Sequence, residues 1–329
     1  MADRLTRWSA ILVLAAVFLP GATSARSVPP VEMSLAPEQT PEALAASGEA
    51  GAPEAPSEVS APLVVFPLPP ALKPLFERTQ VVSLYGYPGI PGMGDLGKYS
   101  PDEAATEASR LAAEYDALNG ERDAIGALHL IVSVAQPVPK EDGSYLNRLD
   151  HEVIATYVEA ARAHGVLLIL DTQCGMVDPV AEAQLLAPFL DEPFVHLALD
   201  PEFAMRASGG VPGEVIGSLD SSEVNAVQDY LAELVRRRAL PPKILVVHQF
   251  REDMLTHSEP WQDRPEVLRT INVDGWGDIG TKLETYGAYA LSSYAEHPAI
   301  KLFEDWDVPL MTPAQVLALP RQPDLVVYQ

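Results

Sequence analysis

The chain has 329 residues, of which 46 are acidic and 22 are basic, and its formal net charge is −24. A protein this acidic cannot neutralise many phosphates, so we expect no nucleic acid among its partners. The single cysteine excludes an internal disulfide and any zinc or iron–sulfur site built from cysteines. Hydrophobic residues make up 47% and charged residues 21% of the chain, which is typical of a globular protein.

The first 25 residues have the pattern of a secretory signal peptide. Arg4 and Arg7 form a short basic region, the apolar run 9–19 follows it, and small residues at 22–25 suit a signal peptidase. The apolar run is about half the length of a membrane-spanning helix, which needs roughly 20 residues. We therefore expect an exported protein, secreted or at the cell surface, with no membrane span after signal cleavage.

Residues 26–62 are predicted to be a disordered linker rich in proline, alanine and glutamate. This segment contains seven prolines, six glutamates and no aromatic residue. Such a composition cannot bury enough apolar surface to offset the entropy lost on ordering. The rest of the chain, residues 63–329, is close in length to the roughly 250 residues of a (β/α)₈ barrel, and we expect it to form one domain.

Apolar segments alternate with helical patterns along residues 63–329. Near-continuous apolar strands separated by helices indicate a parallel sheet covered on both faces. Their number favours a closed (β/α)₈ TIM-like barrel over an open doubly wound sheet, although the helix after the fifth strand is poorly defined. The expected strands are 81–86, 124–135, 166–171, 194–200, 243–249, 268–274, 300–303 and 325–328, and the expected helices are 101–118, 150–164, 179–190, 221–238 and 281–294.

Acidic residues stand at the ends of several expected strands, where a barrel carries its chemistry. Asp171, Asp200 and Asp274 each end a strand, and Glu202 follows Asp200 after one proline. We predict that Glu202 is a general acid/base and that Asp200 raises its pKa, with Asp171 or Asp274 as the second catalytic carboxylate. For any one of these acids the alternative is a helix N-cap or a loop residue that binds backbone amides.

Polar and aromatic residues near the same strand ends are candidates for substrate binding. Aromatic faces stack on sugar rings and exclude water from them. The candidate substrate-binding residues are Tyr85, Tyr87, Gln173, His248 and Trp276.

His129 and His196, unlike His248, lie in the middle of expected strands, and we interpret them as hydrogen-bonded core residues. Cys174 lacks a neighbouring histidine in the sequence, so we interpret it as a small packing residue.

Three segments, 81–89, 170–173 and 196–203, resemble parts of the exported glycoside-hydrolase-like barrels of bacteria. The chain also resembles, over about residues 80 to 320, an exported bacterial (β/α)-barrel family of unassigned function that is similar to glycoside hydrolases. This resemblance implies a barrel and a site region, and it names no substrate. Glycosidases need two carboxyl groups, one to protonate the leaving oxygen and one to attack the sugar or activate water.

The sequence therefore predicts an exported glycoside-hydrolase-like protein that acts on a polysaccharide or cell-wall glycan by carboxylate acid–base catalysis. A carbohydrate is the expected partner, and we expect the protein to be a monomer. We expect no cofactor, because the glycines at 92, 94 and 97 lie in a proline-rich loop without the other elements of a phosphate-binding motif.

Two alternatives remain open. A metal-dependent hydrolase could hold a hard cation through oxygen ligands and His248. The histidines, however, lack the spacing of metal ligands in the sequence, so we expect no metal. The other alternative is a barrel that binds a glycan without catalysis. The residues considered for the metal were Asp171, Asp200, Glu202, His248 and Asp274.

Overall fold

The structure is a computed structural model, and it describes residues 75–329. The expected signal peptide (1–25), the expected linker (26–62) and the first residues of the expected barrel domain (63–74) lie outside the described residues. None of the helices within the described part is both long enough and apolar enough to cross a bilayer.

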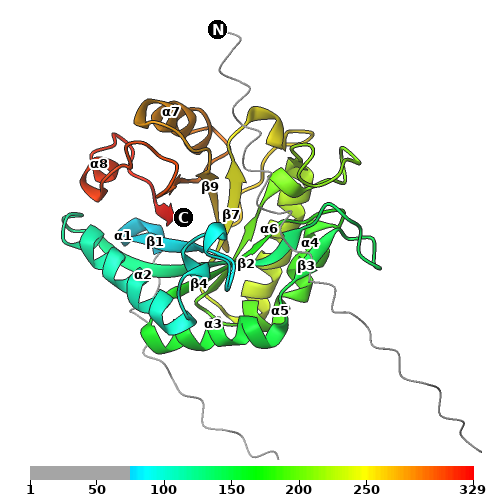
Figure 1. Cartoon of the computed structure of the whole chain (residues 1–329), viewed down its shortest axis with the longest axis horizontal. Helices are drawn as coiled ribbons and strands as arrows, with labels where there is room; N and C mark the ends of the chain where they lie inside the picture. The colour runs from blue at the N-terminus through cyan, green and yellow to red at the C-terminus, as the bar shows by residue number, and fades with distance from the viewer. Residues whose placement is uncertain (1–74) are drawn as a thin grey trace, which may run out of the picture. The chain divides into compact units, whose positions relative to one another are not determined.

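Eight parallel strands form a closed barrel with helices between them, which confirms the predicted (β/α)₈ TIM barrel (Figure 1). The last strand, β11, pairs with the first, β1, so the C-terminal end lies beside β1. A short strand that the sequence did not predict, β3 (Leu146–Arg148), adds to β2 in antiparallel orientation. In order around the barrel, the eight strands are β1 Thr79–Gly86, β2 Asp123–Ala135, β4 Leu167–Thr172, β5 Val195–Leu199, β7 Lys243–Gln249, β9 Val267–Val273, β10 His297–Leu302 and β11 Leu325–Tyr328.

The helices occur close to where the sequence places them. Helix α2 begins with the expected capping box, in which Ser100 and Glu103 bind each other's backbone N–H groups. The helix expected at 179–190 is divided in two at Leu186, and the one expected at 281–294 is α7 followed by a π-helical turn. The α-helices are α1 Leu75–Arg78, α2 Pro101–Asp116, α3 His151–His164, α4 Pro179–Leu185, α5 Ala187–Leu190, α6 Ser221–Arg238, α7 Ile279–Thr285 and α8 Pro313–Leu317.

The connection from β7 to β9 contains no α-helix, which explains the weak sequence pattern there. It consists of a 3₁₀ turn, Glu252–Met254, and a two-residue strand, β8 (Leu255–Thr256). β8 pairs with another two-residue strand, β6 (Leu219–Asp220), just before α6. The connection from β7 to β9 is therefore a loop, and its short strand β8 is held to β6 at the start of α6.

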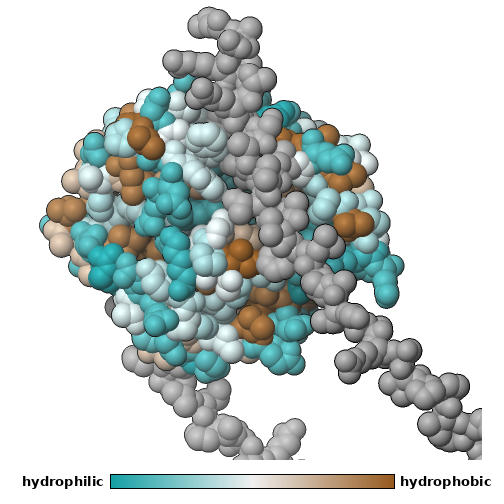
Figure 2. Space-filling view, viewed as in Figure 1, coloured by the Kyte–Doolittle hydropathy of each residue, from teal (hydrophilic) through white to brown (hydrophobic). Residues whose placement is uncertain are grey.

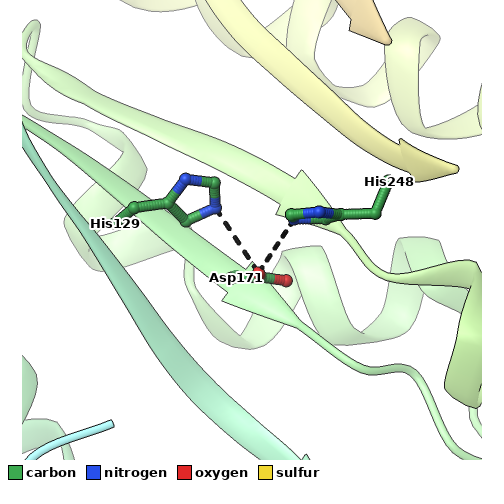
Figure 3. Close-up of side chains that lie close together, drawn as sticks. All are labelled: His129, Asp171 and His248. Atoms are coloured by element: carbon green, nitrogen blue, oxygen red, sulfur yellow. Dashed lines mark hydrogen bonds and ion pairs between the residues drawn. The ribbon is translucent and has the colours of Figure 1, made fainter. Parts of the chain in front are cut away.

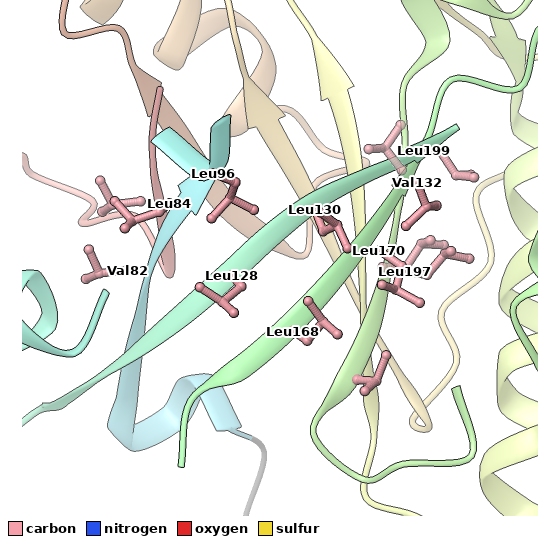
Figure 4. Close-up of a cluster of buried hydrophobic side chains, with 14 of the residues drawn as sticks. Val82, Leu84, Leu96, Leu128, Leu130, Val132, Leu168, Leu170, Leu197 and Leu199 are labelled. Atoms are coloured by element: carbon pink, nitrogen blue, oxygen red, sulfur yellow. The ribbon is translucent and has the colours of Figure 1, made fainter. Parts of the chain in front are cut away.

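Side chains on each strand alternate between two cores. Those facing outward pack beneath the helices, and many of them are leucines, as Figure 4 shows for Leu84, Leu130 and Leu170. Their neighbours in sequence, such as Ile169 and Ala198, face the interior of the barrel. Because side chains on a strand repeat every two residues, this parity also turns the residues at positions 171, 200, 248 and 274 inward.

The loop after β1 folds back over the end of that strand. Its Gly94 has a φ of 112°, and a Cβ atom there would lie 2.4 Å from the carbonyl oxygen of Tyr85. Only glycine fits this close approach, since it has no Cβ and tolerates positive φ. The glycines of the loop thus serve backbone packing, and they bring Gly92 and Met93 to the wall of a cavity.

The surface is of mixed polarity. On the face shown in Figure 2, apolar residues form separate small groups among hydrophilic ones. The most exposed large apolar side chains, Leu118, Val138 and Val308, come from distant parts of the sequence. Scattered apolar residues of this kind are ordinary on a protein surface, so the functional site is better sought at the end of the barrel.

Candidate functional site

A cavity of about 130 Å³ lies at the C-terminal end of the barrel. Active sites of such barrels lie at this end, because the loops that follow the strands meet there. Its polar lining comes from side chains at the ends of different strands, and aromatic side chains form much of its wall. The polar residues are Tyr85, Gln173, Asp200, Glu202, Asp274 and Lys301, and the aromatic ones include Phe203, Phe250, Trp276, Phe303 and Trp306.

The structure brings most of the predicted site residues together at this cavity, but not all of them. Asp171 and His248 are fully buried in the barrel and do not line the cavity wall. Tyr87 is half-buried, packs against the inner core and does not line it either. The predicted residues that do line the cavity are Tyr85, Gln173, Asp200, Glu202, Asp274 and Trp276.

A row of alternating histidines and aspartates runs through the buried interior to the cavity. His129 on β2 and His248 on β7 both point toward Asp171 on β4 (Figure 3). The Nε2 atoms of His129 and His248 lie 3.4 Å and 3.1 Å from Asp171 Oδ2. The other ring nitrogen of His248, Nδ1, lies 3.2 Å from Oδ2 of Asp274, which lines the cavity. His248 therefore joins a buried carboxylate to one that a ligand can touch.

The two aspartates keep His248 charged. Burial alone would lower its pKa, but the negative charges of Asp171 and Asp274 and their hydrogen bonds raise it to about 10. Burial would likewise raise the pKa of Asp171, but the charge of His248 and the close contacts of both histidine rings with its carboxylate hold it well below its usual range. Burial lowers the pKa of His129 to about 4, so this ring is neutral.

Asp200 and Glu202 differ from Asp171 in that their pKa values are raised, which favours the neutral, protonated form. Burial raises the pKa of Glu202 well above its usual range, and the charges of Asp200 and Asp274 add to the effect. Burial also raises the pKa of Asp200, to about 7, although the cations His248 and Lys301 oppose it. The Asp200 carboxylate accepts a hydrogen bond from the Glu202 N–H at 3.1 Å. Asp200 is thus both a cap for the turn that carries Glu202 and a charged neighbour of its carboxyl.

Asp200→Asn is expected to be more stable than wild type, and this difference in the free energy of unfolding should grow as the pH rises. The native Asp200 holds its proton up to about pH 7, whereas in the unfolded chain it loses it near pH 3.9. Between these two pH values the native state binds more protons at Asp200 than the unfolded state does. Asp200 therefore makes the free energy of unfolding fall as the pH rises. The asparagine variant, which keeps an acceptor for the Glu202 N–H, should exceed wild type by roughly 2–4 kcal/mol at pH 8 and by little at pH 4.

Urea unfolding at the two pH values measures this difference. Asp123→Asn, a change of the same kind at an exposed position, is the matched control and should give the same small difference at both. A gain for Asp200→Asn that does not grow between pH 4 and pH 8 would show that Asp200 is ionised in the native protein.

His129, Asp171 and His248 could also hold a metal ion. Their ligand atoms all lie within 4.8 Å of one another. The contact between His248 Nδ1 and Asp274 is the second interaction that metal-bound histidines commonly make with a carboxylate. Both ring nitrogens of His129 and Oδ1 of Asp171 are buried, and none of them has a hydrogen-bond partner among residues 75–329. The donor set therefore fits a divalent cation, while Asp171 and Asp274 already satisfy His248 without one.

No known protein family, curated protein or solved structure matches the chain. Its function must therefore be argued from the site, because a barrel fold supports many unrelated chemistries. Within one cavity the structure combines a carboxyl group biased toward its neutral form, a carboxylate paired with an imidazolium, and aromatic walls. This combination can donate a proton to one atom of a ligand while a negative charge faces another.

Sequence reasoning missed two residues of the site. His129 was interpreted as a core histidine, yet its ring faces Asp171, and Lys301 was not singled out. The sequence pattern could have indicated both residues, since each is a polar side chain at an inward-facing position of an otherwise apolar strand. The interpretation of His196 is confirmed, because its Nδ1 accepts a hydrogen bond from the Ile244 N–H at 3.0 Å. Cys174 is buried in the outer core, as expected of a packing residue.

Proposed function

We propose that the protein is a glycoside hydrolase that acts outside the cytoplasm on a polysaccharide or cell-wall glycan. The observation that carries this proposal is the contrast between two carboxyl groups in one cavity. Glu202 has a raised pKa because it is partly buried beside other acids, whereas Asp274 is paired with the charged ring of His248. Carboxyl groups placed in such different environments mark the acid and the carboxylate of glycosidases.

The roles follow from these environments. Glu202 donates its proton to the glycosidic oxygen as the bond breaks, and Asp274 either attacks the sugar or activates water. Asp274 is the better second carboxylate than Asp171, because Asp274 lines the cavity and Asp171 has no exposed surface. When Asp200 is ionised, above about pH 7, its negative charge helps keep the proton on Glu202 until substrate arrives. His248 holds Asp274 in place from below.

The aromatic wall supports a sugar as the ligand. Trp276, Phe303 and Trp306 line the same cavity as the acids. Flat apolar faces cover the C–H face of a sugar ring, while carboxylates accept hydrogen bonds from its hydroxyl groups. An aromatic cavity with several acceptors therefore suits a neutral polyhydroxylated ligand better than an anionic one.

Release of reducing ends from a panel of polysaccharides, together with hydrolysis of aryl glycosides, tests the proposal. Wild type should hydrolyse at least one substrate, and Asp274→Asn should lose most of that rate. Asp305→Asn, at an exposed position just beyond β10, is the matched control and should keep it. A folded wild-type protein that binds glycans without hydrolysing any of them would support the non-catalytic alternative instead.

A metal-dependent hydrolase is the second candidate, and the His129–Asp171–His248 group favours it. In that case purified protein should contain about one equivalent of a divalent metal. A chelator should abolish hydrolysis, and the metal should restore it. Hydrolysis that continues unchanged after complete removal of metal would exclude this candidate and leave acid–base catalysis by the carboxyl groups.

A further inference from the structure

Strand β10 carries a lysine into the cavity that the proposed hydrolysis does not use. Lys301 is only 4% exposed, yet it lines the cavity. Its Nζ atom lies 3.6 Å from the centre of the Tyr85 ring and 5.1 Å from the centre of the Phe303 ring. These two ring contacts are the interactions of Nζ within residues 75–329, where it makes no hydrogen bond and no ion pair.

The other buried lysines of the described chain are bound differently. Lys243 donates hydrogen bonds from Nζ to the carbonyl oxygens of Glu192 and Val195. Lys282 donates to the carbonyl oxygen of Gly275 at 2.8 Å and forms an ion pair with Asp307 at 2.9 Å. Both of these amines hold loops and strands together. Lys301, by contrast, lines space that a ligand can enter.

The surroundings of Lys301 favour a reactive amine. Burial lowers its pKa, although the charges of Asp274, Asp171 and Asp200 oppose the shift. A buried lysine with a lowered pKa spends more time as the neutral amine, which is the nucleophilic form. The rings of Tyr85 and Phe303 shield the nitrogen from water on two sides.

We propose that Lys301 forms an imine with a small, neutral hydroxyaldehyde or hydroxyketone that enters this cavity, an activity separate from glycoside hydrolysis. The nitrogen lone pair attacks the carbonyl carbon, the C=O π pair moves to oxygen, and oxygen gains the proton that nitrogen loses. The hydroxyl group of this carbinolamine then leaves as water with a proton from Glu202, while the nitrogen lone pair forms the C=N bond. The iminium formed in this step returns its N–H proton to the Glu202 carboxylate and becomes the neutral imine. One carbonyl compound and one amine thus give one imine and one water.

The acids of the cavity determine which carbonyl compound fits. Asp200, Glu202 and Asp274 line the same cavity as the amine, so an anionic compound such as a 2-oxo acid meets acidic groups there. A neutral compound with hydroxyl groups instead donates hydrogen bonds to these carboxyl oxygens. The cavity of about 130 Å³ has room for a compact compound of this kind.

Reductive trapping tests the proposal on the wild-type full chain. The protein is incubated with glycolaldehyde or dihydroxyacetone and cyanoborohydride, which reduces an imine to a stable secondary amine, and modified lysines are mapped by mass spectrometry. Lys301 should be labelled faster than the exposed Lys140, since a lowered pKa raises the share of the neutral amine. Pyruvate, the anionic probe, should label Lys301 more slowly than either neutral compound.

Lys301→Arg keeps the positive charge but cannot form an imine, so this variant should lose the label at position 301 while Lys140 is labelled as before. Labelling of wild-type Lys301 no faster than that of Lys140 would overturn the proposal and leave Lys301 as a counter-ion of the surrounding acids. Faster labelling by pyruvate would overturn the assigned ligand class. None of these measurements depends on glycoside hydrolysis, so the two proposals can fail separately.

Discussion

Glu202→Gln is expected to lower the rate of glycoside hydrolysis by about 10²–10⁴-fold, the usual contribution of a general acid. Glutamine keeps the size of the side chain but has no proton to give to the leaving oxygen. The loss should be largest for polysaccharides and smallest for aryl glycosides whose leaving group is already acidic, because such a group needs little protonation. Rates measured across a series of leaving groups check this dependence.

Glu214→Gln is the matched control for this prediction, since Glu214 is an exposed loop residue away from the cavity. It should keep the wild-type rate on every substrate. An equal loss for Glu202→Gln on all leaving groups would contradict the role of Glu202 as proton donor, and it would point to a role in binding.

His248→Leu is expected to cost about 3–5 kcal/mol of unfolding free energy, the usual effect of breaking a buried ion pair from one side. The variant leaves Asp171 and Asp274 in the barrel without the imidazolium between them. Urea unfolding measures the loss. His196→Leu is the matched control, because His196 is also buried but has no acid partner in the described part of the chain. It should cost less, since it removes one hydrogen-bond acceptor.

The cost of His248→Leu should depend on pH. His248 has a pKa raised to about 10, so its protonation stabilises the fold fully below the unfolded value near 6.5, and this contribution is lost as the pH rises through 10. Asp171 has a lowered pKa, so its contribution is present above about pH 4 and is lost in stronger acid. The gap between variant and wild type should therefore be widest between about pH 4 and 6.5.

Adding Asp171→Asn to His248→Leu tests whether unpaired charge causes the loss. The second change removes one of the two carboxylates left without a cation, so the double variant should regain part of the lost stability. A double variant whose losses simply add would show that packing, rather than charge, accounts for the cost of removing His248.

Local patterns predict the barrel well because each strand is a run of apolar residues with a fixed alternation. That alternation also explains why the acids at positions 200 and 274 could be placed at one end of the barrel. How deep a side chain lies within the barrel cannot be predicted in this way. Asp171 pairs with Ala198 on β5 and with Ile131 on β2, and this stagger buries it below the cavity. Register between strands depends on the whole barrel and cannot be read from one strand.

The segment between β7 and β9 was hard to predict for a related reason. Its backbone is held by side chains of α6 rather than by a helix of its own. Gln228 donates a hydrogen bond to the carbonyl oxygen of Gln262, and Asn225 donates one to that of Pro260. Asn225 Oδ1 in turn accepts a hydrogen bond from the N–H of Gln262. These contacts join residues more than thirty positions apart, so no local sequence pattern reveals them.

The seam between β1 and β11 affects how the chain reaches its fold. Val81 pairs with Leu325, so the barrel closes only when its first and last strands meet. Until then the inner core, to which β1 and β11 contribute Val81, Leu325 and Val327, stays open on one side. Contacts this distant in sequence form slowly. A growing chain would therefore stay open until its last strand is made, so we expect the barrel to close only after the whole chain is available.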